Sequence, residues 1–128
     1  MEANKISGII VDAAVKIHSA IGPGCFERVY EEVLYFELNK RGLLVERQIT
    51  MPIEYDILII NDAYRLDLFI EKKIIIEIKS IEHILPVHFK QVTTYLKLMN
   101  VKNGMILNFK TNLMKEGIHR AFNNFGTE

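Results

Sequence analysis

The chain has 128 residues, a hydrophobic content of 49% and no formal net charge at pH 7, and we expect one globular domain over residues 1–128. Zero net charge disfavours strong non-specific binding to nucleic acid, so any such contact must come from a local group of basic side chains. Cys25 is the only cysteine, which excludes an internal disulfide, and no apolar run is long enough to span a bilayer or to act as a secretory signal. We therefore expect a cytoplasmic protein that does not associate with membranes.

Two helices are predicted before the first strand. Apolar residues recur at helical spacing over 5–20 and again over 26–41, and a glycine ends or follows each segment. In the second segment Phe26 begins the apolar face and Glu27 falls inside that face, whereas Glu31 lies nearer its edge. A carboxylate inside an apolar face needs a partner or a metal ion, unless it is a first-turn glutamate stabilised by the helix N-terminus.

The middle of the chain is predicted to be extended. Residues 45–60 read as extended structure, and Pro52 marks an edge, a bulge or a bend there because proline cannot donate to a ladder. Asn61–Asp62 is a turn signal. We therefore expect this turn to lead into the strand that follows.

Residues 64–79 contain two apolar runs around a Glu-Lys-Lys turn, and the runs carry Asp67, Glu77 and Lys79. Since strand side chains alternate between faces, Glu77 and Lys79 share one face and the alternate isoleucines share the other. A two-residue loop would place Asp67 opposite Ile78, whereas a three-residue loop would place it opposite Glu77. Two adjacent carboxylates are unfavourable unless a cation lies between them, and their hard oxygen atoms favour Mg²⁺ or Mn²⁺. The alternative is an exposed sheet face of mixed charge.

A third helix and further strands are predicted in the rest of the chain. A proline in the first turn suits a helix over 86–100, which places Gln91 and Tyr95 on one face, four residues apart. The pattern alone would make Tyr95 a core aromatic with a polar tip. Asn103–Gly104 is a turn signal before the next strand. A short buried strand is expected at 105–109, whereas the pattern over 113–122 is ambiguous and a last strand at 117–122 is one interpretation of it.

Three sequence motifs follow one another along the chain. Asp67 with the later run Glu77-Ile78-Lys79 resembles the D…(D/E)xK signature of the PD-(D/E)XK nuclease superfamily. Upstream, residues 24–30 (GCFERVY) resemble the motif that names the GxxExxY proteins, a branch of that superfamily. Downstream, residues 91–95 (QVTTY) are similar to the QxxxY motif of RecB-type nucleases.

This resemblance covers residues 18–120, and it departs from the superfamily pattern at one place. Arg65 and Leu66 stand where a proline often precedes the first Asp. The resemblance implies an α/β fold of the PD-(D/E)XK nuclease-like, or restriction-endonuclease-like, kind. We expect an αβββαβ core with an extra N-terminal helix and a mixed sheet.

The resemblance also implies an activity, the metal-dependent hydrolysis of phosphodiester bonds in nucleic acid, with DNA as the expected substrate. Asp67 and Glu77 would hold Mg²⁺ or Mn²⁺, and the Ile78 carbonyl would be a further ligand. Glu27 would complete or orient the site, with Glu31 as the other candidate.

Three more side chains receive roles from the resemblance. Lys79 would position the attacking water or stabilise charge in the transition state, and Gln91 and Tyr95 would orient the nucleic acid or the metal ligands. Several surface lysines are candidates for phosphate contacts, with solvated surface as the alternative: Lys72, Lys73, Lys90, Lys97 and Lys110.

A second function of another class fits the same fold. The domain could be a non-catalytic module that keeps the nuclease fold and binds nucleic acid or protein. The chain is also short for the fold, so a homodimer or a larger complex is expected to help select the substrate. The sequence leaves open DNA against RNA, single against double strands, and cleavage at ends against cleavage within a strand.

Overall fold

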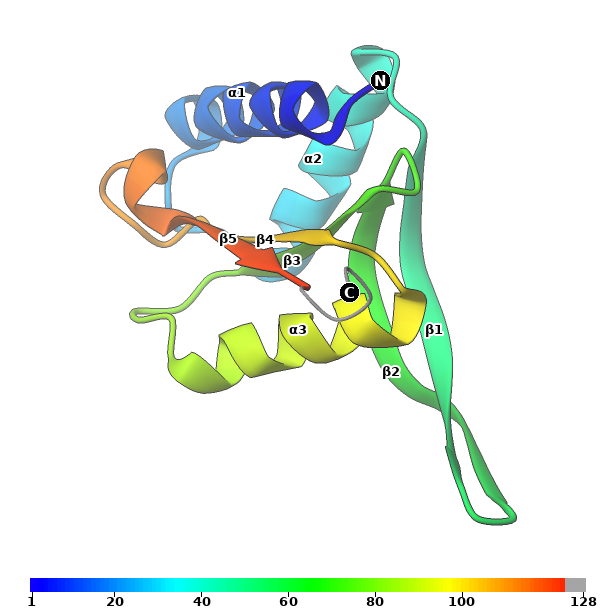
Figure 1. Cartoon of the computed structure of the whole chain (residues 1–128). Coiled ribbons are helices and arrows are strands. Elements are labelled where there is room, and N and C mark those ends of the chain that lie inside the picture. Colours follow the sequence, from blue (N-terminus) through cyan, green and yellow to red (C-terminus); the bar gives the residue numbers. More distant parts are fainter. Residues whose placement is uncertain (124–128) are drawn as a thin grey trace.

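The computed structural model describes residues 1–123, in which a five-stranded mixed sheet is covered by helices on both faces (Figure 1). The elements follow one another as α1 (Ala3–Ile21), α2 (Glu27–Lys40), β1 (Val45–Tyr55), β2 (Leu58–Ile70), β3 (Ile74–Lys79), α3 (Pro86–Met99), β4 (Asn103–Asn108), the 3₁₀ helix η1 (Met114–Gly117) and β5 (Ile118–Phe122). The strands lie in sequence order, with β3 and β4 parallel and the other neighbours antiparallel. The predicted αβββαβ core with an extra N-terminal helix, here α1, is confirmed.

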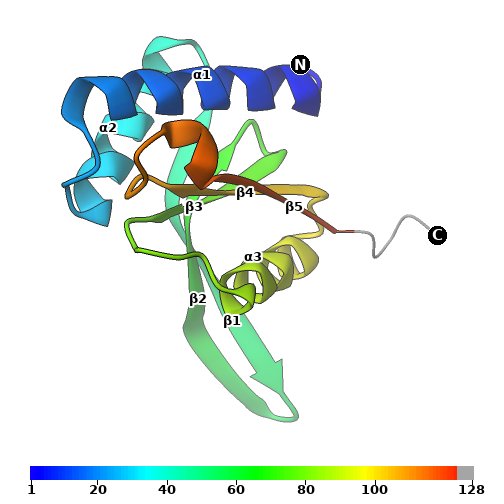
Figure 2. The same cartoon turned by 90° about the vertical axis from the view of Figure 1, so that its left-hand side faces the viewer.

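Two apolar layers lie on opposite faces of the sheet. Helices α1 and α2 cover one face and α3 covers the other (Figures 1 and 2). The alternation expected for β3 is confirmed, because Ile74, Ile76 and Ile78 pack in the layer under α1 and α2, whereas Ile75 packs in the layer under α3. Glu77 and Lys79 have the same parity as Ile75, so they belong to the α3 face. Among the described residues, no helix combines the length and apolarity that crossing a membrane requires.

The β2–β3 hairpin has the three-residue loop that brings Asp67 opposite Glu77. Ile70 pairs with Ile74 and Leu68 pairs with Ile76, which leaves residues 71–73 as the loop. Glu71 and Lys72 have φ angles of 52° and 54°, in the left-handed region that tight hairpin loops use. The two-residue alternative is excluded by this register.

The β1–β2 hairpin extends well past the rest of the molecule as a two-stranded arm (Figures 1 and 2). The expectation for Pro52 is confirmed, because β1 is an edge strand with an irregular register between Met51 and Ile53. The turn expected at Asn61–Asp62 is wrong, since the chain reverses at Asp56, between the paired residues Tyr55 and Leu58. Asp62 does adopt a left-handed φ of 56°, but as an irregularity inside β2.

Two further expectations differ from the structure. Asn103–Gly104 does not form a turn but begins β4, and the left-handed residue in this connection is Asn100, directly after α3, with a φ of 55°. A Cβ on Gly104 would lie 2.9 Å from Cγ1 of Val92, so this glycine lets α3 approach the sheet. Phe26 is not buried: it precedes the first turn of α2 and its residue is 81% exposed.

Candidate functional site

The site lies where β2 and β3 separate. Their regular pairing ends at Leu68–Ile76, and Asp67 and Glu77 follow as the next opposed residues. The backbone N–H of Asp67 donates to Oε1 of Glu77 (3.2 Å), and the backbone N–H of Ile78 donates to Oδ2 of Asp67 (2.8 Å). Each carboxylate therefore reaches across the gap to the opposite strand and replaces a ladder bond with a side-chain bond.

The backbone of β1 is also irregular beside Asp67. The β1–β2 register passes from Arg47–Leu68 to Ile49–Leu66, so Gln48 lies opposite Asp67 without forming a ladder pair with it. Gln48 has a φ of 53°, an uncommon conformation for a residue other than glycine. As a result, Asp67 is released from regular pairing on both sides, and its N–H is available to Glu77.

The two carboxyl groups hold their protons more tightly than usual. Glu77 is 5% exposed, and its pKa is raised chiefly by burial and then by the negative charge of Asp67. The pKa of Asp67 is raised chiefly by burial and also by the charges of Glu31 and Glu27, while the Ile78 N–H and Lys79 act in the opposite direction. A proton or a cation is therefore favoured between these groups near neutral pH.

Backbone direction places the Ile78 carbonyl on the open side of β3. The Lys79 carbonyl accepts a hydrogen bond from the Phe109 N–H (3.0 Å), so Lys79 presents its backbone groups to β4. Successive residues of a strand present these groups to opposite sides. Ile78 therefore presents both its N–H, which donates to Asp67, and its carbonyl to the gap between β2 and β3.

Lys79 lies close enough to both carboxyl groups for its charge to lower their pKa values. No ion pair of the described residues includes it, so its ammonium group is not fixed by a single carboxylate. The predicted sharing of one face by Glu77 and Lys79 fits the effect of the Lys79 charge on the pKa of Glu77.

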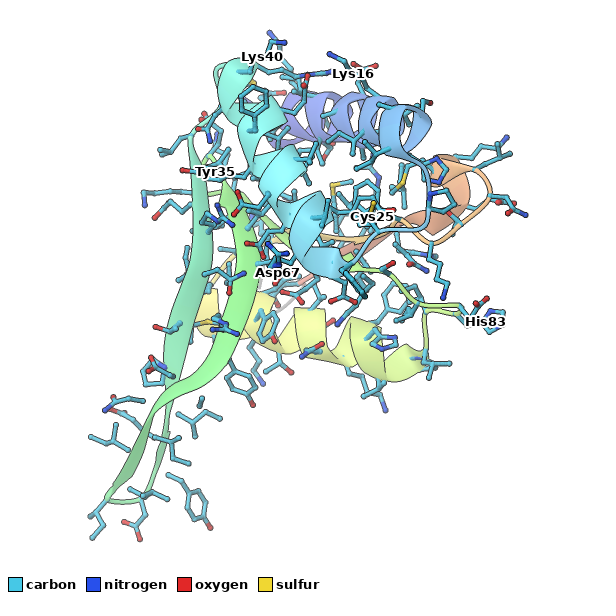
Figure 3. The ribbon with its side chains drawn as sticks, turned by 180° about the vertical axis from the view of Figure 1, so that it is seen from behind. Lys16, Cys25, Tyr35, Lys40, Asp67 and His83 are labelled. Atoms are coloured by element: carbon cyan, nitrogen blue, oxygen red, sulfur yellow. The ribbon has the colours of Figure 1, made fainter. Side chains whose placement is uncertain are left out.

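Glu27 approaches the site from the first turn of α2. Its Oε2 accepts a hydrogen bond from the backbone N–H of Ser80 (3.1 Å), directly after β3, and its charge raises the pKa of both Asp67 and Glu77. Figure 3 shows this first turn, next to the labelled Cys25, beside the labelled Asp67. Glu27 is exposed, so its predicted burial in the apolar face of the helix is wrong.

Glu31, one turn after Glu27 in α2, is a buried carboxylate, 7% exposed, and it is already paired. It accepts hydrogen bonds from Arg47 (2.9 Å) and from the side-chain amide of Gln48, and Arg47 also pairs with Glu32. Its charge still contributes to the raised pKa of Asp67. The two glutamates lie one helical turn apart. Glu27 faces the end of β3, whereas Glu31 is paired with Arg47 of β1.

Helix α3 contributes Gln91 and Tyr95 to the same place. Burial, followed by the charge of Glu77, raises the pKa of Tyr95 to about 12, and the Gln91 side chain hydrogen-bonds to its phenol group. The ring of Tyr95 meets that of Tyr64 edge to face, with centroids 5.7 Å apart. The phenol therefore stays protonated at neutral pH, close to the carboxyl groups.

Three residues near the site received no role from the sequence: Tyr30, Ser80 and Gln48. Tyr30 donates its hydroxyl proton to the Gly22 carbonyl and accepts the Cys25 N–H (3.1 Å), which holds the loop before α2. Ser80 donates its hydroxyl to the Cys25 carbonyl (3.0 Å). Spacing within 24–30 singles out Tyr30, but no sequence signal marks Ser80 or the left-handed Gln48.

The candidate ligand atoms at the site are oxygens, the type of ligand that a hard divalent cation prefers. Asp67 and Glu77 are adjacent buried carboxyl groups, and the Ile78 carbonyl is directed toward the same gap, which are the oxygen ligands that Mg²⁺ and Mn²⁺ prefer. Within residues 1–123, however, no three His, Cys, Asp or Glu side chains are grouped closely enough to hold a metal ion. Binding would therefore require a backbone carbonyl or water to complete the ligands, or a movement of the Glu27 side chain toward Asp67 and Glu77.

Comparison with protein families decides which fold family this geometry belongs to. The family model of the PD-(D/E)XK nuclease superfamily matches residues 4–121. The chain belongs to the PD-(D/E)XK nuclease superfamily. Searches among curated proteins and among solved structures give no match. Proteins of this superfamily are generally nucleases that act on nucleic acid and typically use divalent metal ions, so a nuclease-type function is indicated for this chain.

Proposed function

We propose that this protein is a metal-dependent hydrolase of phosphodiester bonds in nucleic acid, with DNA as the substrate. The observation that carries the proposal is the crossed pair of carboxyl groups, Asp67 and Glu77, at the end of the β2–β3 ladder. Burial and the negative charge of neighbouring carboxylates raise the pKa of both groups. Near neutral pH, two ionised carboxylates are therefore unfavourable here unless a proton or a cation binds between them. Asp67 and Glu77 also belong to the part of the sequence that resembles the D…(D/E)xK signature, and the chain belongs to the superfamily that this signature names.

Oxygen atoms from two strands and one helix would hold the metal ion. Asp67, Glu77 and the Ile78 carbonyl would supply these oxygen atoms from the gap between β2 and β3, and Glu27 approaches the gap from α2. A bound Mg²⁺ or Mn²⁺ would lower the pKa of water and neutralise charge on the scissile phosphate. Glu31 has a weaker claim, because Arg47 and Gln48 already use its oxygen atoms.

The remaining side chains would act on substrate and water. Lys79 lies on the carboxylate face without a fixed ion-pair partner, so it is suited to orient water or to stabilise charge in the transition state. Tyr95 keeps its proton and is positioned by Gln91, which suits a hydrogen-bond donor to a phosphate oxygen. A cytoplasmic location and a homodimer or larger complex stay predictions from the sequence.

A non-catalytic binding module is the second candidate. It is favoured by the lack, among the described residues, of three clustered metal-ligating side chains. It is disfavoured by Asp67, Glu77 and Lys79, because a module without catalysis has no need to place two buried acids and a lysine together.

A cleavage assay separates the two candidates. Wild-type protein would be incubated with Mg²⁺ or Mn²⁺ and end-labelled single- and double-stranded DNA and RNA. We expect cleavage that requires the metal and is lost in Asp67→Asn. Asp56→Asn is the matched control, because it makes the same chemical change at the tip of the arm, where the left-handed φ suits Asn. Metal binding by calorimetry without cleavage of any substrate would favour the binding module.

A further inference from the structure

A depression of about 620 Å³ opens beside the carboxylate site, at the loop that precedes α2. Glu27 and Ser80 belong to its walls, and the hydrogen bond between them joins the depression to the end of β3. Glu27 also links the depression to the proposed reaction centre, because it lines the depression and its charge acts on both Asp67 and Glu77. Figure 3 marks its position through Cys25, which also lines it.

The walls combine an exposed aromatic ring with two cations. Phe26, the residue before α2, is 81% exposed, and Arg28 and Lys110 lie around the same depression. Lys110 pairs with Glu82 at 3.4 Å, but both side chains are exposed, so a phosphate group could replace this weak pair. Aromatic rings beside cations are the composition of sites that bind single-stranded nucleic acid.

A second exposed phenylalanine, within α2 itself, provides a comparison within the molecule. Phe36 is also exposed, at 66%, but it is not among the residues that line this depression. The two rings are ten residues apart, which corresponds to about 15 Å along a helix. Exposure of a phenylalanine alone therefore does not distinguish Phe26, whereas its position beside Arg28, Lys110 and Glu27 does.

We propose that this depression binds an unpaired nucleotide next to the scissile phosphate, with its base stacked on Phe26 and its phosphate contacted by Arg28 and Lys110. The position next to the scissile bond rests on the proposed function. An aromatic side chain can stack on the face of a base only where that base is not already stacked within a duplex. The substrate class is thus a single strand or a frayed end rather than an intact duplex.

Equilibrium binding without divalent ions tests the proposal separately from cleavage. Fluorescently labelled single-stranded DNA and a blunt duplex of the same sequence would be titrated with wild-type protein and variants. We expect tighter binding of the single strand and a loss of about 5-fold to 100-fold in Phe26→Ala, the range for loss of one base–aromatic stack. Phe26→Tyr should bind like wild type, and Phe36→Ala, the matched control, should also bind like wild type.

The cations and the base can be tested one at a time. Lys110→Gln and Arg28→Gln should each reduce the dependence of log K on log salt by about 0.7, as for one phosphate contact to a single strand. Lys40→Gln, a change at the far end of α2, should leave the slope unchanged. An abasic nucleotide moved along the strand should weaken binding to wild type at one position only, and at that position Phe26→Ala should cause no further loss.

Defined results overturn the proposal. Equal binding by wild type and Phe26→Ala, equal losses in Phe26→Ala and Phe36→Ala, or equal affinity for the single strand and the duplex would each do so. If wild type and Phe26→Ala cleave a substrate equally well, this subsite is wrong while the proposed hydrolase stands. If no substrate is cleaved but binding of the single strand depends on Phe26, the hydrolase is wrong while the binding site stands.

Discussion

The backbone N–H of Asp67 donates a hydrogen bond to the Glu77 carboxylate at 3.2 Å, and the Asp67 carboxylate in turn accepts the N–H of the residue after Glu77 at 2.8 Å. The two acids therefore stabilise each other's strand through hydrogen bonds while their charges repel. Burial strengthens the repulsion, since it removes the solvent that would screen two negative charges. The geometry that holds the site open thus also makes it sensitive to protons and cations.

The first prediction concerns pH and stability without divalent ions. The folded-state pKa values of Asp67 and Glu77 lie above their ordinary values of 3.8 and 4.5, so the folded protein binds more protons than the unfolded chain. Stability should therefore fall as pH rises from about those ordinary values through the raised folded values. Glu77→Gln should remove part of this fall and be more stable than wild type at pH 8, by on the order of 1 kcal/mol, in urea unfolding.

Glu54→Gln is the control for that experiment, because Glu54 lies on the exposed arm. It should leave the difference in stability between pH 5 and pH 8 as in wild type. An identical pH profile for wild type and Glu77→Gln would show that the carboxyl pair does not carry the repulsion.

The second prediction concerns metal binding measured by melting temperature. Mn²⁺ at about 100 times its Kd should stabilise wild type by about 2.7 kcal/mol, and chelation should reverse the effect. Because the ion competes with protons for the same carboxylates, the gain should be larger at pH 8 than at pH 6. Asp67→Asn should lose it and Asp56→Asn should keep it. Equal gains in these two variants would place the metal elsewhere.

The third prediction separates chemistry from folding at Lys79. Lys79→Ala should stay folded but be modestly less stable without metal, since the nearby cation that lowers both carboxyl pKa values is gone. Cleavage should fall by on the order of 10²-fold, while Mn²⁺ affinity should be unchanged or higher. Calorimetry and cleavage rates measure the two effects, with Lys40→Ala as the control. Cleavage by Lys79→Ala at the wild-type rate would remove the catalytic role.

The fourth prediction distinguishes the two helix carboxylates. Glu27→Gln keeps a side-chain oxygen for the Ser80 N–H but removes the charge near Asp67, so it should reduce metal affinity and cleavage while hardly changing the melting temperature. Glu31→Gln breaks a buried pair with Arg47 and should chiefly lower stability. Metal affinity and melting temperature should be measured for both. The reverse pattern would make Glu31 the metal ligand.

Strand parity was the most informative part of the sequence. It reduced the hairpin to two alternatives, because the alternation of side chains is fixed by backbone geometry, and the observed register is the one that places Asp67 opposite Glu77. Turn signals were less informative. Asn61–Asp62 and Asn103–Gly104 lie inside strands, since a left-handed or glycine residue can serve a local irregularity or a close helix contact as well as a reversal.

Helix periodicity predicted the position of the second helix correctly but not the exposure of Phe26 and Glu27. Counting residues made Phe26 buried and Glu27 part of the apolar face, whereas Phe26 precedes the helix and Glu27 lies in its open first turn. Burial there depends on which neighbouring element covers the turn, and Glu31, one turn later, meets Arg47 of β1 instead. Gln48 could not be predicted, because no turn residue marks its left-handed conformation, and its side-chain bond to Glu31 joins residues 17 positions apart in the sequence.

The two ends of β2 differ in their resistance to local unfolding, because one end lies in the arm and the other in the sheet core. Its distal end is solvated, with Ile57 95% exposed, whereas Leu66, Leu68 and Ile70 near the sheet core are fully buried. Few apolar contacts oppose local opening at the tip, so its amide protons should exchange with solvent through fluctuations that leave the rest folded. Those of the core segment should exchange only on global unfolding. Asp67 lies between the fully buried Leu66 and Leu68, away from the arm tip (Figure 3), so local opening of the tip should leave the backbone around Asp67 folded.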